Sequence, residues 1–301
     1  MPTNSYSQKF DISKSQELKN KLSNFSFEET AHALWRAKGS GVTVTLYKSG
    51  KILVQGTGTE NFIHEYLGQN VEKQTTLNLP TEKNDKIEHS FTSWIGTDES
   101  GKGDYFGPLI IASVAITPKN QEILGNLGIK DSKKLDDKQI AQLAIKIKQN
   151  SLFSIVTITP QKYNELYKSF NNLNKLLAWG HARAIENILE KAPDGSIKNA
   201  ISDKFGDESF IKNALMKNGK NINLIQRVRA ESDLAVASAS VLARDEFVKR
   251  IDKLSSEFGI SLPKGASSLV LEAAKEFVNK HGKSQLNRVA KLHFKTTKEI
   301  L

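Results

Sequence analysis

The sequence predicts an α/β protein with a mixed sheet, preceded by a smaller α+β unit. Two β-favouring runs follow one another from residue 94 onward, and helical periodicity alternates with short strands from there to the end of the chain. The first 69 residues carry a separate helix–hairpin–helix pattern, and the residues after them are polar and aperiodic. We therefore expect a domain over 1–69, a linker over 70–91 and a second domain over 92–301.

The composition limits the classes of function. The chain has 301 residues, and 43 Lys and Arg against 33 Asp and Glu give a formal charge of +10. This balance favours polyanionic partners such as nucleic acid, although a solvated lysine-rich surface produces the same count. The absence of cysteine excludes disulfides, thiolate metal sites and thiol catalysis.

No segment predicts contact with a membrane. The first eleven residues lack the apolar core of a secretory signal, and the longest apolar run, around residues 108–116, is too short for a membrane helix. We expect a cytoplasmic protein. Nothing in the sequence implies a protein partner, so a monomer is expected.

The smaller unit contains a hairpin between two helices. A helix is predicted over 14–23 with Ser13 as its N-cap, a hairpin over 42–47 and 52–55, and a closing helix over 60–67. Alternation places the Thr and Tyr side chains of the first hairpin strand on one face. That face either lies on a nucleic acid or is simply solvated.

The larger unit alternates helices and strands. A helix over 136–149 directs Ile140, Leu143, Ala144 and Ile147 inward. The further elements are a strand over 152–159, a helix over 173–191, strands over 198–202 and 221–226, and the longest helix over 233–254.

Three acidic positions stand at the ends of predicted elements, where functional residues are concentrated. Asp98 and Glu99 lie where the strand from Trp94 gives way to a glycine turn, Asp203 ends a strand, and Asp233 opens a helix. Neighbours on a regular strand point to opposite faces, so the strand is expected to end or bulge at Glu99. Asp203 alone reads as a turn acid, and Asp233 alone as a helix N-terminal acid.

The stretch from Gly96 to Lys102 fits the spacing of a phosphate-binding loop, but this interpretation fails. Gly103 stands where Ser or Thr should hold magnesium, and Pro108 and a β-branched run follow where a helix is required. Two carboxylates inside the loop would also repel phosphates. If the four acids converge, their mutual repulsion requires divalent cations, and oxygen ligands without His or Cys indicate Mg²⁺ or Mn²⁺.

Four segments resemble the type 2 ribonucleases H, in the same order and over roughly residues 92–301. They are Gly96-Thr-Asp-Glu-Ser-Gly-Lys-Gly-Asp-Tyr-Phe-Gly-Pro108, Asp131-Ser-Lys-Lys-Leu135, Asp203-Lys-Phe-Gly206 and Glu231-Ser-Asp-Leu-Ala-Val-Ala-Ser-Ala-Ser-Val-Leu-Ala-Arg244. The chain is most similar to the ribonuclease HIII family, because Lys102 stands where ribonuclease HII usually has arginine and because an additional N-terminal unit is present. The resemblance implies a ribonuclease H-like mixed-sheet catalytic domain and an N-terminal α+β domain like the TATA-box-binding protein, which binds substrate.

The resemblance also implies an activity and a site. The activity is endonucleolytic cleavage of the RNA strand of RNA:DNA hybrids, with two divalent ions and with 5′-phosphate and 3′-hydroxyl products. The implied catalytic residues and metal ligands are Asp98, Glu99, Asp203 and Asp233. The implied nucleic-acid contacts are Gly101, Lys102, Gly103, Ser132 and Lys133, although a plain turn and a solvated charge cluster are the simpler alternatives for these segments. None of the six histidines lies in these motifs, and none is expected to act as a base.

Two alternatives remain open at this stage. One is ribonuclease HII-type excision of single embedded ribonucleotides, although the C-terminal tyrosine that HII enzymes use has no counterpart after Tyr167. The other is a non-catalytic hybrid-binding protein. A basic C-terminal stretch (Lys280, Lys283, Arg288, Lys291, Lys295 and Lys298) is either an electrostatic footprint for nucleic acid or a solvated basic helix.

Overall fold

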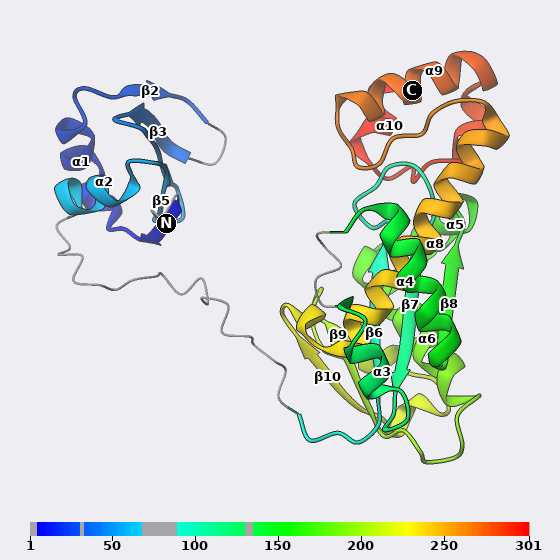
Figure 1. Cartoon of the computed structure of the whole chain (residues 1–301). Helices are drawn as coiled ribbons and strands as arrows, with labels where there is room; N and C mark the ends of the chain where they lie inside the picture. The colour runs from blue at the N-terminus through cyan, green and yellow to red at the C-terminus, as the bar shows by residue number, and fades with distance from the viewer. Residues whose placement is uncertain (1–4, 31–32, 68–88, 130–134, 301) are drawn as a thin grey trace. The chain divides into compact units, whose positions relative to one another are not determined.

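The computed structural model describes residues 5–30, 33–67, 89–129 and 135–300 (Figure 1). The chain divides into two compact units, Met1–Lys83 and Asn84–Leu301. Of the predicted linker over 70–91, only residues 89–91 are described, so its boundaries stay a prediction. Each unit is described by itself below.

The smaller unit is a five-stranded antiparallel sheet with helices on one face. The strand order is β1-β5-β4-β3-β2. Its apolar core joins the inward side of the sheet to the helices, with Leu18, Phe25, Val44 and Phe62 among the buried residues. The elements are β1 (Ser5–Lys9), the 3-10 helix η1 (Ile12–Lys14), α1 (Ser15–Lys21), β2 (Ser26–Glu28), β3 (Ala33–Gly39), β4 (Val42–Tyr47), β5 (Lys51–Gly56) and α2 (Thr59–Tyr66).

The predicted hairpin of the smaller unit is confirmed as β4 and β5, but the prediction missed β1, β2 and β3. The cap of the first helix was also assigned wrongly. Ser13 lies inside η1, and the N-cap of α1 is Lys14, which makes no side-chain cap bond. Asp11 caps η1, and its carboxylate accepts the Ser13 amide at 3.0 Å and the Ser13 hydroxyl at 2.8 Å. An aspartate two residues earlier therefore uses Ser13 as a donor.

The larger unit is built on a mixed five-stranded sheet of order β10-β9-β6-β7-β8. Strands β10, β9 and β6 run parallel, and β7 runs antiparallel to both of its neighbours, β6 and β8. The predicted mixed sheet is therefore confirmed. The strands are β6 (Trp94–Ser100), β7 (Leu109–Ile116), β8 (Phe153–Ile158), β9 (Asn199–Asp203) and β10 (Asn223–Arg227).

Helices cover both faces of this sheet (Figure 1). The long helix α8 packs on β6 and β7, and α6 packs on the other face against β6, β7 and β8. The helices are α3 (Gln121–Gly125), α4 (Asp137–Asn150), α5 (Pro160–Phe170), α6 (Leu173–Leu189), α7 (Ser209–Ala214), η3 (Gly219–Asn221), η4 (Ala230–Ser232), α8 (Leu234–Phe258), α9 (Ser268–His281), η5 (Lys283–Arg288) and α10 (Lys295–Ile300).

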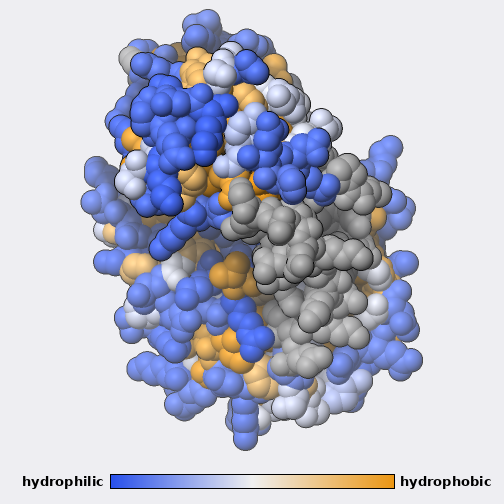
Figure 2. All heavy atoms as spheres, turned by 90° about the vertical axis from the view of Figure 1, so that its left-hand side faces the viewer, coloured by the Kyte–Doolittle hydropathy of each residue, from blue (hydrophilic) through white to orange (hydrophobic). Residues whose placement is uncertain are grey.

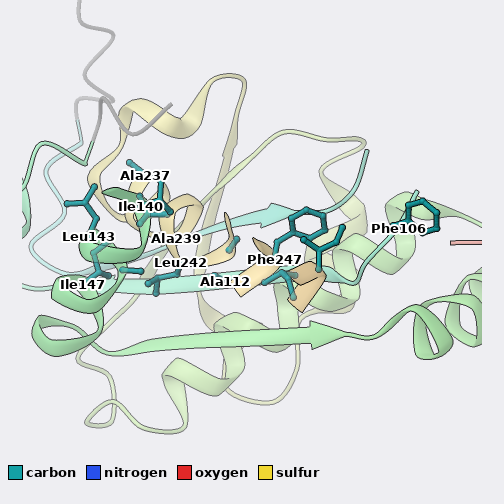
Figure 3. Close-up of a cluster of buried hydrophobic side chains, with 14 of the residues drawn as sticks. Phe106, Ala112, Ile140, Leu143, Ile147, Ala237, Ala239, Leu242 and Phe247 are labelled. Carbon is teal, nitrogen blue, oxygen red and sulfur yellow. The ribbon is translucent and has the colours of Figure 1, made fainter. Parts of the chain in front are cut away.

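Small residues let α8 lie against the sheet. A Cβ atom added at Gly96 of β6 would stand 2.1 Å from the Val236 nitrogen, so only glycine fits there. The first two turns of α8 are rich in Ala and Ser, and its inward face joins the predicted apolar face of α4 in one cluster that includes Ile140, Leu143 and Leu242 (Figure 3). Asp136 begins α4 with a capping box to Gln139.

The described residues on the face drawn in Figure 2 are mainly hydrophilic. Figure 2 shows hydrophilic side chains over most of one face, with hydrophobic residues only in small patches between them. Among the described helices, none is both long enough and apolar enough to cross a membrane.

Candidate active site

Two parallel strands bring predicted acids to the same end of the sheet. In the β6–β9 register, Thr97 pairs with Ser202. The next residue of each strand is an acid, so Asp98 and Asp203 lie side by side on neighbouring parallel strands. Asp203 is the last residue of β9, and its Oδ1 accepts the Ala230 amide at 3.2 Å. The pairing of β6 with β9 therefore joins two acids that lie far apart in the sequence.

The predicted end or bulge of the strand at Glu99 is wrong. Strand β6 continues to Ser100 with an unbroken register against β7. Asp98 and Glu99 consequently point to opposite faces. Asp98 bonds Ser240 of α8, and Glu99 contacts His181 of α6 at 3.2 Å. Each acid is held by the helix on its own side, so no bulge is needed to anchor both.

The two adjacent carboxyls have opposite pKa shifts. Burial and then the charge of Glu99 raise the pKa of Asp98 to about 7. Burial alone would raise the pKa of Glu99 as well, but the hydrogen bond and charge of His181, followed by those of Lys102, lower it to about 2. Glu99 is therefore ionised and neutralised within the protein, whereas a charge on Asp98 lacks equivalent compensation.

Asp233 has the partners of a helix cap. Its Oδ1 accepts the amides of Ala235 at 2.9 Å and Val236 at 3.0 Å, and its carboxylate also contacts Trp94 Nε1 at 3.1 Å and His89 Nε2 at 3.1 Å. The residue is 4% exposed. These contacts match the simpler interpretation of Asp233 as a helix N-terminal acid, and its place among metal ligands stays a prediction.

Glu231 is a further acid of the motif that contains Asp233. It follows Ala230, whose amide bonds Asp203, and it belongs to the 3-10 helix η4. Sequence reasoning quoted Glu231 in the motif but did not consider it as a site residue.

The two glycines of the turn after β6 differ in their surroundings, because Gly101 is tightly packed and Gly103 has free space around it. Gly101 has φ +89°, and a Cβ atom there would lie 2.2 Å from the Pro108 carbonyl oxygen, so internal packing requires this glycine. A Cβ atom at Gly103 would meet nothing within 4 Å. Lys102 Nζ lies 3.2 Å from Glu99 Oε1 and 5.6 Å from the centre of the Phe205 ring. The predicted contacts Ser132 and Lys133 lie outside the described residues.

The basic C-terminal stretch is not one helix, because its residues are divided among α9, η5, α10 and the segment between η5 and α10, where Lys291 lies. Lys291 is fully buried, and its Nζ donates to the carbonyls of Asp104 at 2.8 Å and Gly107 at 2.7 Å. Burial lowers the pKa of Lys291 to about 7. Lys291 therefore fixes the loop that follows the glycine turn and does not face a ligand.

Comparisons with known proteins identify the family. The ribonuclease HII family model matches residues 95–297, and a domain of unknown function (DUF3378) matches residues 8–78. The ribonuclease HIII of Protochlamydia amoebophila is 46% identical over 277 residues, which are 92% of this chain and 89% of that protein. The chain belongs to the ribonuclease HIII family. A second relative, the ribonuclease HIII of Chlamydia pneumoniae, is 43% identical over 93% of this chain and 92% of its own length.

Solved structures of the ribonuclease HIII family extend the match to both units. The crystal structure of Bst-RNase HIII in complex with Mn²⁺ is 28% identical with a TM-score of 0.67, covering 98% of this chain and 97% of that one. Aquifex aeolicus RNase H3 is 30% identical with a TM-score of 0.55, covering 96% and 99% of the two chains. The predicted fold class, a ribonuclease H-like mixed-sheet domain with an additional N-terminal α+β domain, is confirmed.

The acids of this ribonuclease HIII chain fit divalent metal by their chemistry. Asp98, Glu99 and Asp203 offer only oxygen donors, and the Lys102 ammonium group already stands at one Glu99 oxygen as a cation. Within the described ranges, no three His, Cys, Asp or Glu side chains are close enough to form a metal-binding group. The oxygen donors of these acids therefore suit a divalent cation. In this structure each acid side chain is oriented toward its own partners within the protein.

Proposed function

We propose that this chain is a ribonuclease H endonuclease that hydrolyses the RNA strand of RNA:DNA hybrids and leaves 5′-phosphate and 3′-hydroxyl ends. The observation that carries the proposal is the pairing of β6 with β9, which sets Asp98 and Asp203 side by side with Glu99 next in the chain. Membership in the ribonuclease HIII family supports the same activity. Three carboxylates at one sheet end suit phosphodiester hydrolysis with metal.

Asp98, Glu99 and Asp203 are the residues that would hold two divalent ions, Mg²⁺ or Mn²⁺. Such ions, when bound, activate a water molecule and stabilise the leaving oxygen of an in-line displacement. The Mn²⁺ complex of Bst-RNase HIII supports a divalent requirement. The high pKa of Asp98 adds a physical reason, because a nearby cation relieves the charge that this carboxyl otherwise carries uncompensated.

The fourth acid is proposed to be Asp233, as the family motif implies. Its carboxylate also contacts Trp94, His89 and the first amides of α8. We therefore propose that Asp233 both holds the start of α8 and completes the set of acids.

The glycine turn is proposed to meet the hybrid. Gly103 has the open backbone that a close approach to a ribose 2′-hydroxyl needs, and Lys102 is the cation nearest to the acids. Gly101 supports this turn through its positive φ, and Ser132 and Lys133 are proposed phosphate contacts from the sequence alone. The N-terminal unit is proposed to bind substrate, with the open face of its sheet as the contact surface.

The test is cleavage of a labelled RNA:DNA hybrid with Mg²⁺, with Mn²⁺ and with a chelator. Wild type and Asp98→Asn are compared, and a duplex with one embedded ribonucleotide is the second substrate. Metal-dependent cutting of the hybrid alone, lost in the variant, supports the proposal. Cutting of both substrates indicates ribonuclease HII-type activity, and binding without cutting indicates a hybrid-binding protein.

A further inference from the structure

His181 is a buried residue on α6 that contacts the candidate site although no motif includes it. Its ring is fully buried, with Nδ1 at 2.9 Å from the Thr97 hydroxyl and Nε2 at 3.2 Å from Glu99 Oε2. Thr97 and Glu99 are alternate residues of β6, so both point to the face that α6 covers. The imidazole therefore spans two positions of the strand that carries the acids.

Both partners of the ring are hydrogen-bond acceptors. The Thr97 hydroxyl donates its only hydrogen to the Ala112 carbonyl at 2.9 Å, so its oxygen can only accept from Nδ1. Glu99, whose pKa is lowered to about 2, offers a carboxylate to Nε2. The ring thus has an acceptor oxygen at each nitrogen, and its contact with Glu99 joins the imidazole to a carboxylate.

Aromatic packing holds the His181 ring in this orientation. Phe205 stacks on it with ring centres 5.1 Å apart and planes 20° apart. Phe205 also lies two residues after Asp203, so the same side chain connects the imidazole to the β9 acid. The His181 ring is consequently held by β6 through its two nitrogens and by Phe205 through its ring face.

The two oxygens of Glu99 have different surroundings. Oε2 faces the His181 side chain, which is 1% exposed, and Oε1 faces the Lys102 side chain, which is 37% exposed. Oε1 is therefore the oxygen on the open side of the site. A carboxylate fixed at one oxygen presents the other in a defined direction.

We propose that His181 is a positioning residue that fixes Oε2 of Glu99 and thereby directs Oε1 toward a divalent cation. This inference rests on the proposed function for the identity of the ion, but not for the contacts. Hydrogen-bond partners of metal ligands typically change metal affinity by about 10–100-fold when removed. The same loss is expected here, in Mn²⁺ affinity rather than in hybrid affinity.

Two near-isosteric variants separate positioning from packing. The amide nitrogen of Gln in His181→Gln reaches approximately as far as Nε2 and keeps the Glu99 contact. The shorter Asn in His181→Asn reaches approximately as far as Nδ1 and keeps only the Thr97 contact. Both lose the stacked ring, so both lose similar stability. Mn²⁺ affinity is expected to fall about 10–100-fold in His181→Asn and to stay within a few-fold of wild type in His181→Gln.

The measurement is calorimetric titration of the full chain with Mn²⁺, below the unfolding temperature of each variant, followed by hybrid cleavage at saturating Mn²⁺. His281→Asn is the matched control, because its Nε2 contacts the Phe258 carbonyl at 2.8 Å outside the acid cluster; its Mn²⁺ affinity should equal that of wild type. Equal Mn²⁺ affinity in the Asn and Gln variants of His181 overturns the proposal.

The titration also distinguishes failure of the inference from failure of the proposed function. Suppose that wild type binds Mn²⁺ but does not cut the hybrid, and that His181→Asn binds Mn²⁺ more weakly than wild type. The positioning role of His181 then holds, and the proposed activity is refuted. If wild type cuts the hybrid but His181→Asn keeps its Mn²⁺ affinity, the activity holds and the positioning role is refuted. An unchanged Mn²⁺ affinity in Glu99→Gln also refutes it, because Glu99 is then not a ligand.

Discussion

The charge of Asp98 is expected to destabilise the metal-free protein. Its pKa is raised from 3.8 to about 7, and one pKa unit corresponds to about 1.4 kcal/mol, so the upper value of the penalty is about 4 kcal/mol. Asp98 keeps some contact with solvent, which screens charge, so we take about half, or about 2 kcal/mol. Because the folded pKa lies above the unfolded one, stability is lost as the pH rises from 3.8 toward about 7, and the full penalty applies above it.

Asp98→Asn removes this charge while keeping a polar group beside Ser240. At pH 8, with chelator, the variant should therefore be more stable than wild type by about 2 kcal/mol, and the unfolding midpoint should rise by about 4–8 °C. At pH 4, where Asp98 is protonated in the folded protein, the difference should nearly vanish. Cleavage of the hybrid should be lost at every pH.

Scanning calorimetry at the two pH values measures this difference on the transition of the larger unit. Asp207→Asn is the control, since Asp207 has a lowered pKa from its bonds to Ser209 and should give no gain at pH 8. A variant of Asp98 that is equally or less stable than wild type at pH 8 would refute the reasoning, and so would a gain of the same size at pH 4.

Three further predictions follow from particular contacts. Asp233→Asn should abolish cleavage and should also lower the unfolding midpoint, because it weakens the cap of α8; cleavage retained in Asp233→Asn would contradict this. Lys291→Met leaves buried carbonyls without a donor and should cost about 2–4 kcal/mol in denaturant unfolding, while the exposed Lys280→Met should cost under 1 kcal/mol. Deleting residues 1–69 should raise KM for the hybrid more than it lowers kcat in steady-state assays, and an unchanged KM with a collapsed kcat would contradict a substrate-binding role.

Local features of the sequence predicted the elements around the acids. Strand β7 is a continuous apolar run, α4 has a 3.6-residue apolar period behind a capping box, and Glu99 and Asp203 stand next to or at the last residue of their strands. These signals lie within a few residues of one another, so each can be recognised from a short stretch. The polar strands β1 and β2 lack such a signal, because pairing with β5 and β3 makes them strands rather than their own composition.

The parts of the site that were missed depend on contacts between distant residues. His181 lies 82 positions from Glu99, and Lys291 lies 187 positions from Asp104. Neither spacing leaves a pattern in one sequence. The expected bulge at Glu99 failed for a related reason: it assumed that both acids needed one face, whereas helices on the two faces each hold one acid.

This two-sided arrangement explains why the adjacent acids differ. Glu99 receives its compensating charge from the protein, through His181 on one oxygen and Lys102 on the other. For Asp98, burial and the charge of Glu99 outweigh the hydrogen bond from Ser240 and the more weakly acting charge of His181, so its pKa moves in the opposite direction. A divalent ion beside Asp98 would compensate the charge of its carboxylate. The free energy by which that charge destabilises the metal-free protein would then contribute to the binding free energy of the ion. Wild type saturated with Mn²⁺ should consequently recover at least the stability that Asp98→Asn shows without metal.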